Sequence, residues 1–383
     1  MTLINDTQSL ATFCKPLHET EFITVDTEFM REKTYWPELC LIQIAGPENF
    51  AAIDPRAAGI ELAPLFELLT NANVTKVFHA ARQDLEIFLH LMGEMPKQIF
   101  DTQIAAMVCG FGDAVGYDHL IAKLTKVQLD KSPRFTDWSI RPLSERQIKY
   151  ALADVTHLRE AYKKLSFRLN KENRHSWITE EMALLTNPAT YYTDPGKAYK
   201  KIKGRGKNLL SLAILRELAA WRENEARRRN VPRNRVIRDE VLVEISHQKP
   251  HTTDTLSRTR GLNTKTAHGS IGKQILHAIN KGVNLPEADW PKLEAKPKLP
   301  KGIGPTTDLL KVLLKKVTEE TQVAGRLIAK TSDIELIAGF GDKADVLALS
   351  GWRREIFGLD ALKLCEGKTA LAIDNNKLIT EER

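Results

Sequence analysis

The chain has little cysteine, no long apolar run and no secretory signal at its start. Its four cysteines, Cys14, Cys40, Cys109 and Cys365, are scattered without CxxC spacing. This pattern indicates buried thiols in a reducing compartment, with neither a disulfide framework nor a zinc site. No stretch is long and apolar enough to span a bilayer, and the first residues lack a basic region followed by an apolar one. We therefore expect a cytoplasmic protein that does not enter a membrane.

The length and the charge distribution indicate several domains with different roles. A chain of 383 residues exceeds one compact core, so two or three domains are expected. Residues 1–167 carry 17 Lys and Arg against 22 Asp and Glu, whereas the remainder carries 39 against 27. Basic side chains gain affinity for polyanions by displacing counterions from phosphates, so the basic C-terminal half is expected to bind nucleic acid. A solvated helical surface is the alternative, but residues 195–240 hold 14 basic and only 5 acidic residues.

The first part of the chain reads as an α/β domain. Apolar runs predict strands at residues 22–29, 39–44, 49–54, 76–79 and 99–101. The short breaks between the first three predict adjacent antiparallel strands. Helical periodicity predicts helices at 60–69 and 85–91, after the strand at 99–101 through Val108, and at 144–169, where Ser144 is a candidate N-cap.

The second part reads as helices joined by basic connections. Residues 209–229 form a long predicted helix, and shorter helices are expected around 241–245 and 255–256. Residues 291–305 are rich in Pro and Lys, which is typical of a semi-rigid tether. Another helical set is expected over 307–365, and its loose similarity to the first set hints at a duplication.

Two pairs of polar residues suggest a metal centre. Asp26 and Glu28 lie two apart on a predicted strand, so both point to one face. Two charges on a core strand are costly unless a cation compensates them, although most Asp-x-Glu pairs are surface features. Tyr150 and Asp154 lie four apart on one face of a predicted helix, where core packing is the alternative. Asp84 begins another helix, where the helix dipole alone could explain it.

Longer segments surround these residues: Val25-Asp26-Thr27-Glu28-Phe29, Leu41-Ile42-Gln43, Val77-Phe78-His79-Ala80-Ala81-Arg82-Gln83-Asp84, Phe100-Asp101-Thr102-Gln103, Leu129-Asp130-Lys131-Ser132, Thr136-Asp137-Trp138, Arg141-Pro142-Leu143 and Tyr150-Ala151-Leu152-Ala153-Asp154. Together they resemble the bacterial ribonuclease D family of DEDDy-type 3′→5′ exoribonucleases. The resemblance covers residues 1 to about 170 densely.

The C-terminal half is similar, less densely, to tandem HRDC domains, which are helical nucleic-acid-binding modules. The first carries Leu212-Ala213-Ile214-Leu215-Arg216-Glu217-Leu218, Asn230-Val231-Pro232 and Arg260-Gly261. Gly351-Trp352-Arg353-Arg354 resembles the end of a second, degenerate HRDC domain.

The resemblance implies a specific architecture. It places an RNase H-like α/β catalytic domain, a mixed sheet flanked by helices, at residues 1–170. A basic linker at 171–207 leads to a first all-α HRDC domain at 208–290. The Pro/Lys linker at 291–305 and a second, all-α HRDC-like domain at 306–383 follow.

The resemblance also implies an activity and a catalytic set. It implies metal-dependent hydrolysis of RNA from 3′ ends, release of 5′-mononucleotides and a role in maturing tRNA or other stable RNA. Asp26, Glu28, Asp84 and Asp154 would hold two Mg²⁺ or Mn²⁺ ions, which prefer oxygen ligands. Tyr150 would orient the attacking water, since the ordinary tyrosine pKa of about 10 makes it a poor base.

Substrate contacts are a further expectation. Gln43 and His79 flank the acids and are candidates for the terminal nucleotide, although a satisfied histidine at a strand end is equally plausible for His79. Lys131, Arg134 and Phe135 combine charge with an aromatic face, which suits a single-stranded 3′ tail. For the neighbouring Trp138 we favour core packing.

Arg227 and Arg228 end a long helix. The helix dipole could explain them, but the basic excess favours RNA contact.

Two rival functions use the same sequence features. A DNA proofreading or repair exonuclease would need the same four acids, but the flanking segments favour RNA. A non-catalytic binding protein on a decayed nuclease scaffold is the other alternative. Decayed sites usually lose a metal ligand, whereas this chain keeps all four acids and Tyr150. A monomer is expected, since no self-association feature is visible.

Overall fold

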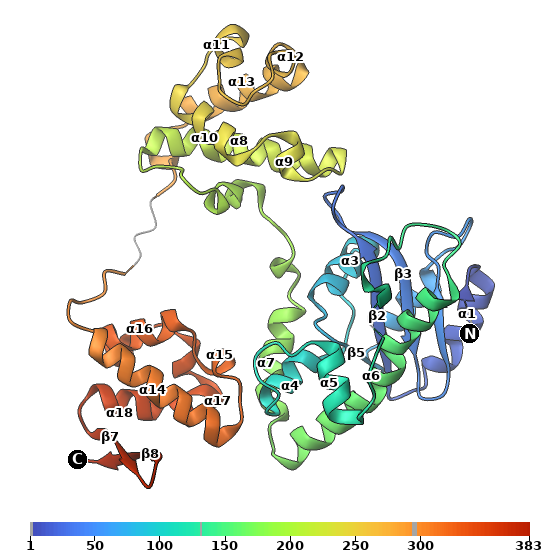
Figure 1. Cartoon of the computed structure of the whole chain (residues 1–383). Helices are drawn as coiled ribbons and strands as arrows, with labels where there is room; N and C mark the ends of the chain where they lie inside the picture. The colour runs from blue at the N-terminus through green and yellow to red at the C-terminus, as the bar shows by residue number, and fades with distance from the viewer. Residues whose placement is uncertain (1–2, 131, 293–296) are drawn as a thin grey trace.

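The computed structural model describes residues 3–130, 132–292 and 297–383. Figure 1 shows three modules: an α/β module from β1 to α7, a first helical module from η3 to η4, and a second helical module from α14 to β8. The chain runs from the α/β module to the first helical module, and then to the second, which lies against α7.

The α/β module is built on a six-stranded mixed sheet in the order β1-β4-β3-β2-β5-β6. Its strands are β1 (Leu3–Ile4), β2 (Phe22–Met30), β3 (Glu38–Ala45), β4 (Phe50–Ile53), β5 (Thr75–Phe78) and β6 (Ile99–Asp101). β3 is antiparallel to both β2 and β4, which confirms the predicted antiparallel trio, while β5 runs parallel to β2 and β6. The fourth strand ends at Phe78, one residue earlier than expected, so His79 belongs to the following turn.

Helices cover both faces of this sheet, as expected. They are α1 (Thr7–Leu17), α2 (Ala63–Thr70), α3 (Arg82–Met92), α4 (Thr102–Val108), α5 (Tyr117–Thr125), α6 (Glu145–Lys171) and α7 (His175–Leu185). α1, α2 and α3 pack with β2 and β3 in one core, and α4 to α7 pack with β5 and β6 in another. Ser144 caps α6 in a reciprocal capping box with Gln147, which confirms the predicted helix start.

The region expected to be a linker begins with a helix. α7 buries Ile178 and Met182 in the core of the α/β module, and Leu185 packs beside them. Their spacing of four and three residues is the helical signal that the sequence already contained. The 3₁₀ turns η2 (Pro188–Thr190) and η3 (Pro195–Lys201) follow, and η3 packs into the first helical module.

The first helical module forms around its longest helix. Its elements are α8 (Leu209–Arg229), α9 (Arg233–Val236), α10 (Asp239–Gln248), α11 (Thr253–Ser257), α12 (Thr264–His268), α13 (Ser270–Val283) and η4 (Glu287–Asp289). α8 has the predicted bounds and ends at Asn230, whose left-handed φ of 48° closes the helix. Gly282 lets α13 approach α8 closely, because a Cβ there would lie 2.6 Å from the Cα of Ile214.

The second helical module is not purely helical, which corrects the expectation of an all-α domain. Its elements are α14 (Gly304–Thr321), α15 (Gly325–Ile328), α16 (Thr331–Phe340), η5 (Gly341–Lys343), η6 (Leu347–Leu349), α17 (Gly351–Arg353), η7 (Arg354–Gly358), α18 (Leu359–Cys365), β7 (Thr369–Asp374) and β8 (Lys377–Glu382). β7 and β8 form an antiparallel hairpin. Asn375 and Asn376 both have positive φ, the conformation that a tight two-residue hairpin turn requires and that asparagine tolerates.

Both helical modules contact the α/β module. Tyr35, between β2 and β3, donates a hydrogen bond to Glu223 of α8. Arg353 of α17 forms ion pairs with Glu180 and Glu181 of α7. Trp177 and Trp352 stack across the same contact, with ring centroids 4.7 Å apart.

Two further expectations concern the cysteines and the absence of a membrane span. All four cysteines are free. Cys14, Cys40 and Cys109 are buried, as predicted, whereas Cys365 is only partly buried. Within the described ranges, none of the helices is both long enough and apolar enough for a membrane span.

Candidate active site

Three of the predicted carboxylates meet beside β2. Oxygen atoms of Asp26, Glu28 and Asp154 all lie within 4.8 Å of one another. Strand alternation puts Asp26 and Glu28 on one face of β2, and α6 brings Asp154 across that face. The Thr24 hydroxyl donates to the carbonyl of Val155 at 2.8 Å, so the contact that fixes α6 on β2 is adjacent to Asp154.

Asp84 is not part of this group of three. It is in the first turn of α3 with only 6% of its surface exposed, and its carboxylate accepts a hydrogen bond from Thr27. Thr27 stands between Asp26 and Glu28 on β2, so this bond ties α3 to the acidic strand. The negative charge of Asp84 also acts on Asp26.

A residue that the sequence did not single out positions Asp84. Asp101, at the end of β6, accepts hydrogen bonds from the backbone N–H of Ala80 at 3.0 Å and of Ala81 at 2.9 Å. Ala80 has a φ of 59°, a left-handed conformation that is unfavourable for alanine. Asp101 therefore holds the strained turn from which α3 and Asp84 begin. The available signal was a second acid at the end of a neighbouring parallel strand.

The acids open into a cavity of about 430 Å³. Tyr150 lines it together with Asp154, one helical turn away, as their predicted spacing requires. Tyr117 and Gln103 also line it, and neither was predicted. The Tyr117 hydroxyl donates to the carbonyl of Ala153 at 3.0 Å, so this side chain forms a fixed wall.

The electrostatics of the site favour a bound cation. Burial raises the pKa of Asp26 well above its usual value, and the charges of Asp84, Asp154 and Glu28 raise it further. Burial also raises the pKa of Asp84, to about 7. Carboxylates crowded in this way resist ionisation until a positive charge compensates them. The donor set is all oxygen, which fits a hard divalent cation.

A pH-dependent response to metal follows from Asp84. Between its usual pKa of 3.8 and about 7, folded metal-free protein holds a proton that the unfolded chain releases. The free energy of unfolding therefore falls as pH rises through this range. A divalent cation bound by these acids would favour the ionised form of Asp84, so we expect added metal to raise the Tm more at about pH 8 than at about pH 6.

Asp84→Asn is the matching test of this response. At about pH 8 it should raise the free energy of unfolding of the metal-free protein by on the order of 2 kcal/mol, and with it the Tm. It should also reduce the increase in Tm that added metal produces. The exposed Asp113→Asn is the control, with no change in either quantity. Calorimetry with and without EDTA measures both, and a metal gain independent of pH would contradict the prediction.

The residues predicted to contact the terminal nucleotide are placed differently. His79 lines the cavity, but its Nδ1 lies 3.0 Å from the Thr102 hydroxyl and its Nε2 lies 3.1 Å from the carbonyl of Val115. Gln43 pairs with Asp26 across β2 and β3 and is fully buried. Neither amide atom of Gln43 has a hydrogen-bond partner among the described residues.

The basic residues predicted to contact RNA differ in how accessible they are. Arg227 donates to the Tyr35 hydroxyl at 3.1 Å and to the carbonyl of Thr193, so it joins two modules. Arg228 is 70% exposed and pairs with Glu225 at 2.8 Å. Lys131 lies outside the described residues. Arg134 belongs to the 3₁₀ turn η1 (Ser132–Phe135).

The aromatic residues near that turn differ in exposure. Trp138 is 2% exposed and packs 6.2 Å from the Tyr150 ring, which confirms the core interpretation. Phe135 is 89% exposed.

The fold and the carboxylate cluster define a metal-dependent 3′–5′ exonuclease. The 3′–5′ exonuclease family profile matches residues 1–170, and the HRDC domain profile matches residues 211–279. The chain is 48% identical to a ribonuclease D of Granulibacter bethesdensis, over 99% of this chain and 96% of that relative. It is 45% identical to a ribonuclease D of Bartonella henselae, over 100% of this chain and 94% of that one. The chain belongs to the ribonuclease D family.

A solved structure supports the same assignment. The crystal structure of Escherichia coli RNase D, an exoribonuclease involved in structured RNA processing, matches with a TM-score of 0.83 and 30% identity. The match covers 96% of this chain and 98% of that one. The predicted RNase H-like domain, helical HRDC domain and metal-dependent 3′→5′ exoribonuclease activity are thereby confirmed. The HRDC match ends at residue 279, so a second HRDC domain stays a prediction.

Proposed function

We propose that the enzyme removes nucleotides one at a time from single-stranded 3′ ends of RNA, with tRNA precursors among its substrates, and uses two Mg²⁺ or Mn²⁺ ions. The observation that carries this proposal is the meeting of Asp26, Glu28 and Asp154 within 4.8 Å beside a cavity. Product release as 5′-mononucleotides follows from attack on the last phosphodiester.

The protein side chains have distinct proposed roles. Asp26, Glu28 and Asp154 would hold the ions, with Asp84 on the side of the second ion. Bound ions supply an activated water at neutral pH and compensate charge on the phosphate. Tyr150 would orient that water from the cavity wall. Asp101 would keep the turn before α3 in place.

Several contacts with RNA are part of the proposal. His79 would contact the terminal nucleotide by replacing one of its present partners. Gln43 is fully buried and is not among the residues that line the active-site cavity, so we do not retain it as a contact. Lys131, Arg134 and Phe135 would contact the tail, where the 89% exposed Phe135 supplies an aromatic side chain. Arg227 and Arg228 would add contacts beyond the active site, where Arg228 is the more accessible.

The remaining expectations are proposals about organisation. We propose catalytic residues 1–170, a connecting segment at 171–207 whose helix α7 packs on the catalytic core, an HRDC domain at 208–290, a tether at 291–305 and a second HRDC-like domain at 306–383. Separate cores in the two helical modules support two domains. A monomeric, cytoplasmic enzyme is proposed with them, and light scattering on a sizing column tests the first of these properties.

Incubation with a 3′-extended tRNA and Mg²⁺ or Mn²⁺ tests the substrate. We expect stepwise shortening at the 3′ end, release of 5′-mononucleotides, and loss of both on adding EDTA. A matched DNA tail provides the comparison and should be degraded more slowly. Internal cleavage, or shortening that EDTA does not stop, would contradict the proposed reaction.

A further inference from the structure

A second cavity, of about 790 Å³, lies next to the active site and is lined by all three modules. It shares Ala80 and Gln103 with the active-site cavity, so the two spaces adjoin. We call the second space the three-module groove. Arg31 and Arg82 come from the α/β module, and Lys201 and Arg233 come from the first helical module. Arg326 comes from the second helical module.

The lining of the three-module groove is strongly basic. Its five cations, Arg31, Arg82, Lys201, Arg233 and Arg326, face two carboxylates, Glu86 and Asp101. Asp101 is occupied by backbone N–H groups, and Glu86 pairs with Arg31 at 2.7 Å. Arg233 pairs with Glu223. Within the described ranges, Arg82, Lys201 and Arg326 make no ion pair, so their charge is available to a polyanion.

Aromatic side chains accompany these cations. Tyr191, Trp36 and Tyr35 line the same groove. The guanidinium of Arg82 lies 6.0 Å from the centre of the Tyr191 ring. Unpaired cations interleaved with aromatic faces suit single-stranded nucleic acid, because the cations bind phosphates and the rings stack on bases.

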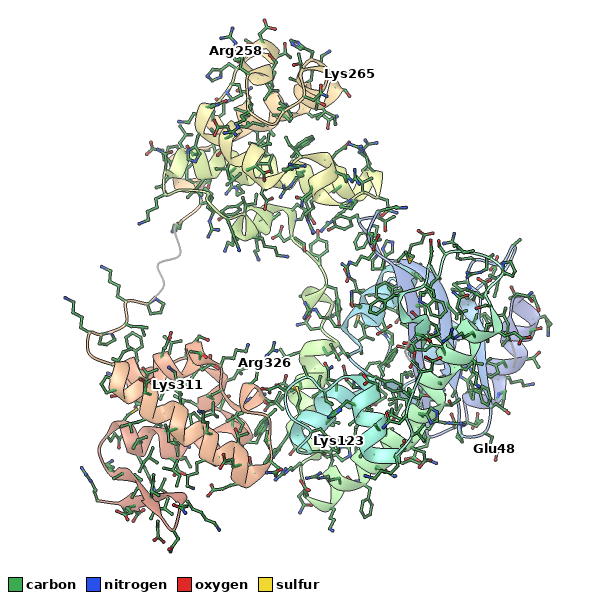
Figure 2. The ribbon with its side chains drawn as sticks, in the orientation of Figure 1. Glu48, Lys123, Arg258, Lys265, Lys311 and Arg326 are labelled. Carbon is green, nitrogen blue, oxygen red and sulfur yellow. The ribbon has the colours of Figure 1, made fainter. Side chains whose placement is uncertain are left out.

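Hydrogen bonds fix the backbone on either side of Arg326. It belongs to α15, and the N–H of Ala324 just before it donates to the carbonyl of Met107 in the α/β module at 2.8 Å. The carbonyl of Leu327 just after it accepts from Arg353 at 2.8 Å. In Figure 2, Arg326 lies on the side of its module that faces the α/β module, whereas Lys311 lies away from that contact.

We propose that the three-module groove binds the single-stranded RNA immediately upstream of the 3′-terminal nucleotide, with Arg326 as a phosphate contact. This inference rests on the proposed function. It assigns an RNA-binding role to the second helical module through one side chain at its contact with the catalytic domain. The contribution of Arg326 to RNA binding should therefore depend on how many nucleotides extend beyond the active site.

Arg326→Gln tests the proposal on a dinucleotide and on a single-stranded RNA of about ten nucleotides. We expect kcat/KM on the longer RNA to fall about tenfold, and the salt dependence of its affinity to flatten by about 0.7 in log–log slope. The loss on the dinucleotide, which is too short to fill the groove, should be much smaller. Lys311→Gln, on α14 of the same module, is the control and should change neither quantity.

A second measurement separates binding from misfolding. 4-Thiouridine placed just upstream of the 3′ end should crosslink to peptides that contain Tyr191 or Arg326. Equal kcat/KM of Arg326→Gln and Lys311→Gln on the longer RNA, or crosslinks confined to other surfaces, would contradict RNA binding in the three-module groove. Wild-type protein that releases no nucleotide from either RNA would instead refute the proposed function, so the two failures are distinguishable.

Discussion

Replacing Asp154 by Asn is expected to lower the rate of 3′-nucleotide release by about a thousandfold, with RNA affinity changed much less. The substitution removes one negative charge from three carboxylates whose oxygens lie within 4.8 Å of one another. The neighbouring hydrogen bond, from the Thr24 hydroxyl to the carbonyl of Val155, does not depend on the Asp154 side chain, so the fold should persist. Single-turnover assays with saturating enzyme measure the chemical step directly.

The matched control for Asp154 is another acid outside the cluster. Asp113 is exposed in the loop before α5, and Asp113→Asn should retain the wild-type rate. Calorimetric titration with Mn²⁺ should show weaker binding to Asp154→Asn only. A variant that loses Asp154 but cleaves at near-normal rate would remove this residue from the metal site.

Replacing Glu223 by Ala is expected to destabilise the first helical module by about 3 kcal/mol or more. Glu223 is fully buried and accepts hydrogen bonds from Arg233 at 2.5 and 2.7 Å and from Tyr35 of the α/β module. Removing the carboxylate leaves both guanidinium groups, Arg233 and Arg227, without their buried partner. Loss of one member of a buried ion pair costs far more than loss of an exposed one.

The pH dependence of this contact has a definite sign. Burial opposes ionisation of Glu223, but hydrogen bonds from Arg233 and Tyr35 outweigh it and hold its pKa below the usual 4.5. Its contribution is therefore complete above about pH 4.5 and is lost as pH falls through the lower folded-state value.

Two variants separate the parts of the Glu223 prediction. Glu225→Ala, on the same helix, removes a buried carboxylate whose partner Arg228 is exposed, so it should cost less. Tyr35→Phe removes only the hydroxyl that joins the modules, and small-angle scattering should then show a looser arrangement of domains. Urea unfolding gives the stability changes. Equal losses for Glu223→Ala and Glu225→Ala would show that the intermodule contact contributes little.

The sequence was sufficient wherever local periodicity governs the outcome. Alternation along a strand puts Asp26 and Glu28 on one face, and helical spacing puts Tyr150 and Asp154 on another, whatever the surroundings. Strand β3 and helix α8 were likewise predictable from their apolar patterns.

The sequence pattern did not predict the short or irregular secondary-structure elements. α7 was read as linker because basic and polar residues surround its few apolar positions. The terminal hairpin was missed because two short strands carry a weak signal, and the Asn375–Asn376 turn becomes informative only once strands flank it.

The sequence by itself predicted a catalytic set of four carboxylates and a tyrosine, and their spacing places them on defined faces of a strand and two helices. Only the tertiary structure decided that Asp101 holds the turn before Asp84, that Arg227 joins two modules, and that Arg82, Lys201 and Arg326 line one groove. Spacing within one strand or helix is fixed by backbone geometry. The approach of residues that lie tens to hundreds of positions apart depends on how strands, helices and whole modules pack, which no local pattern encodes.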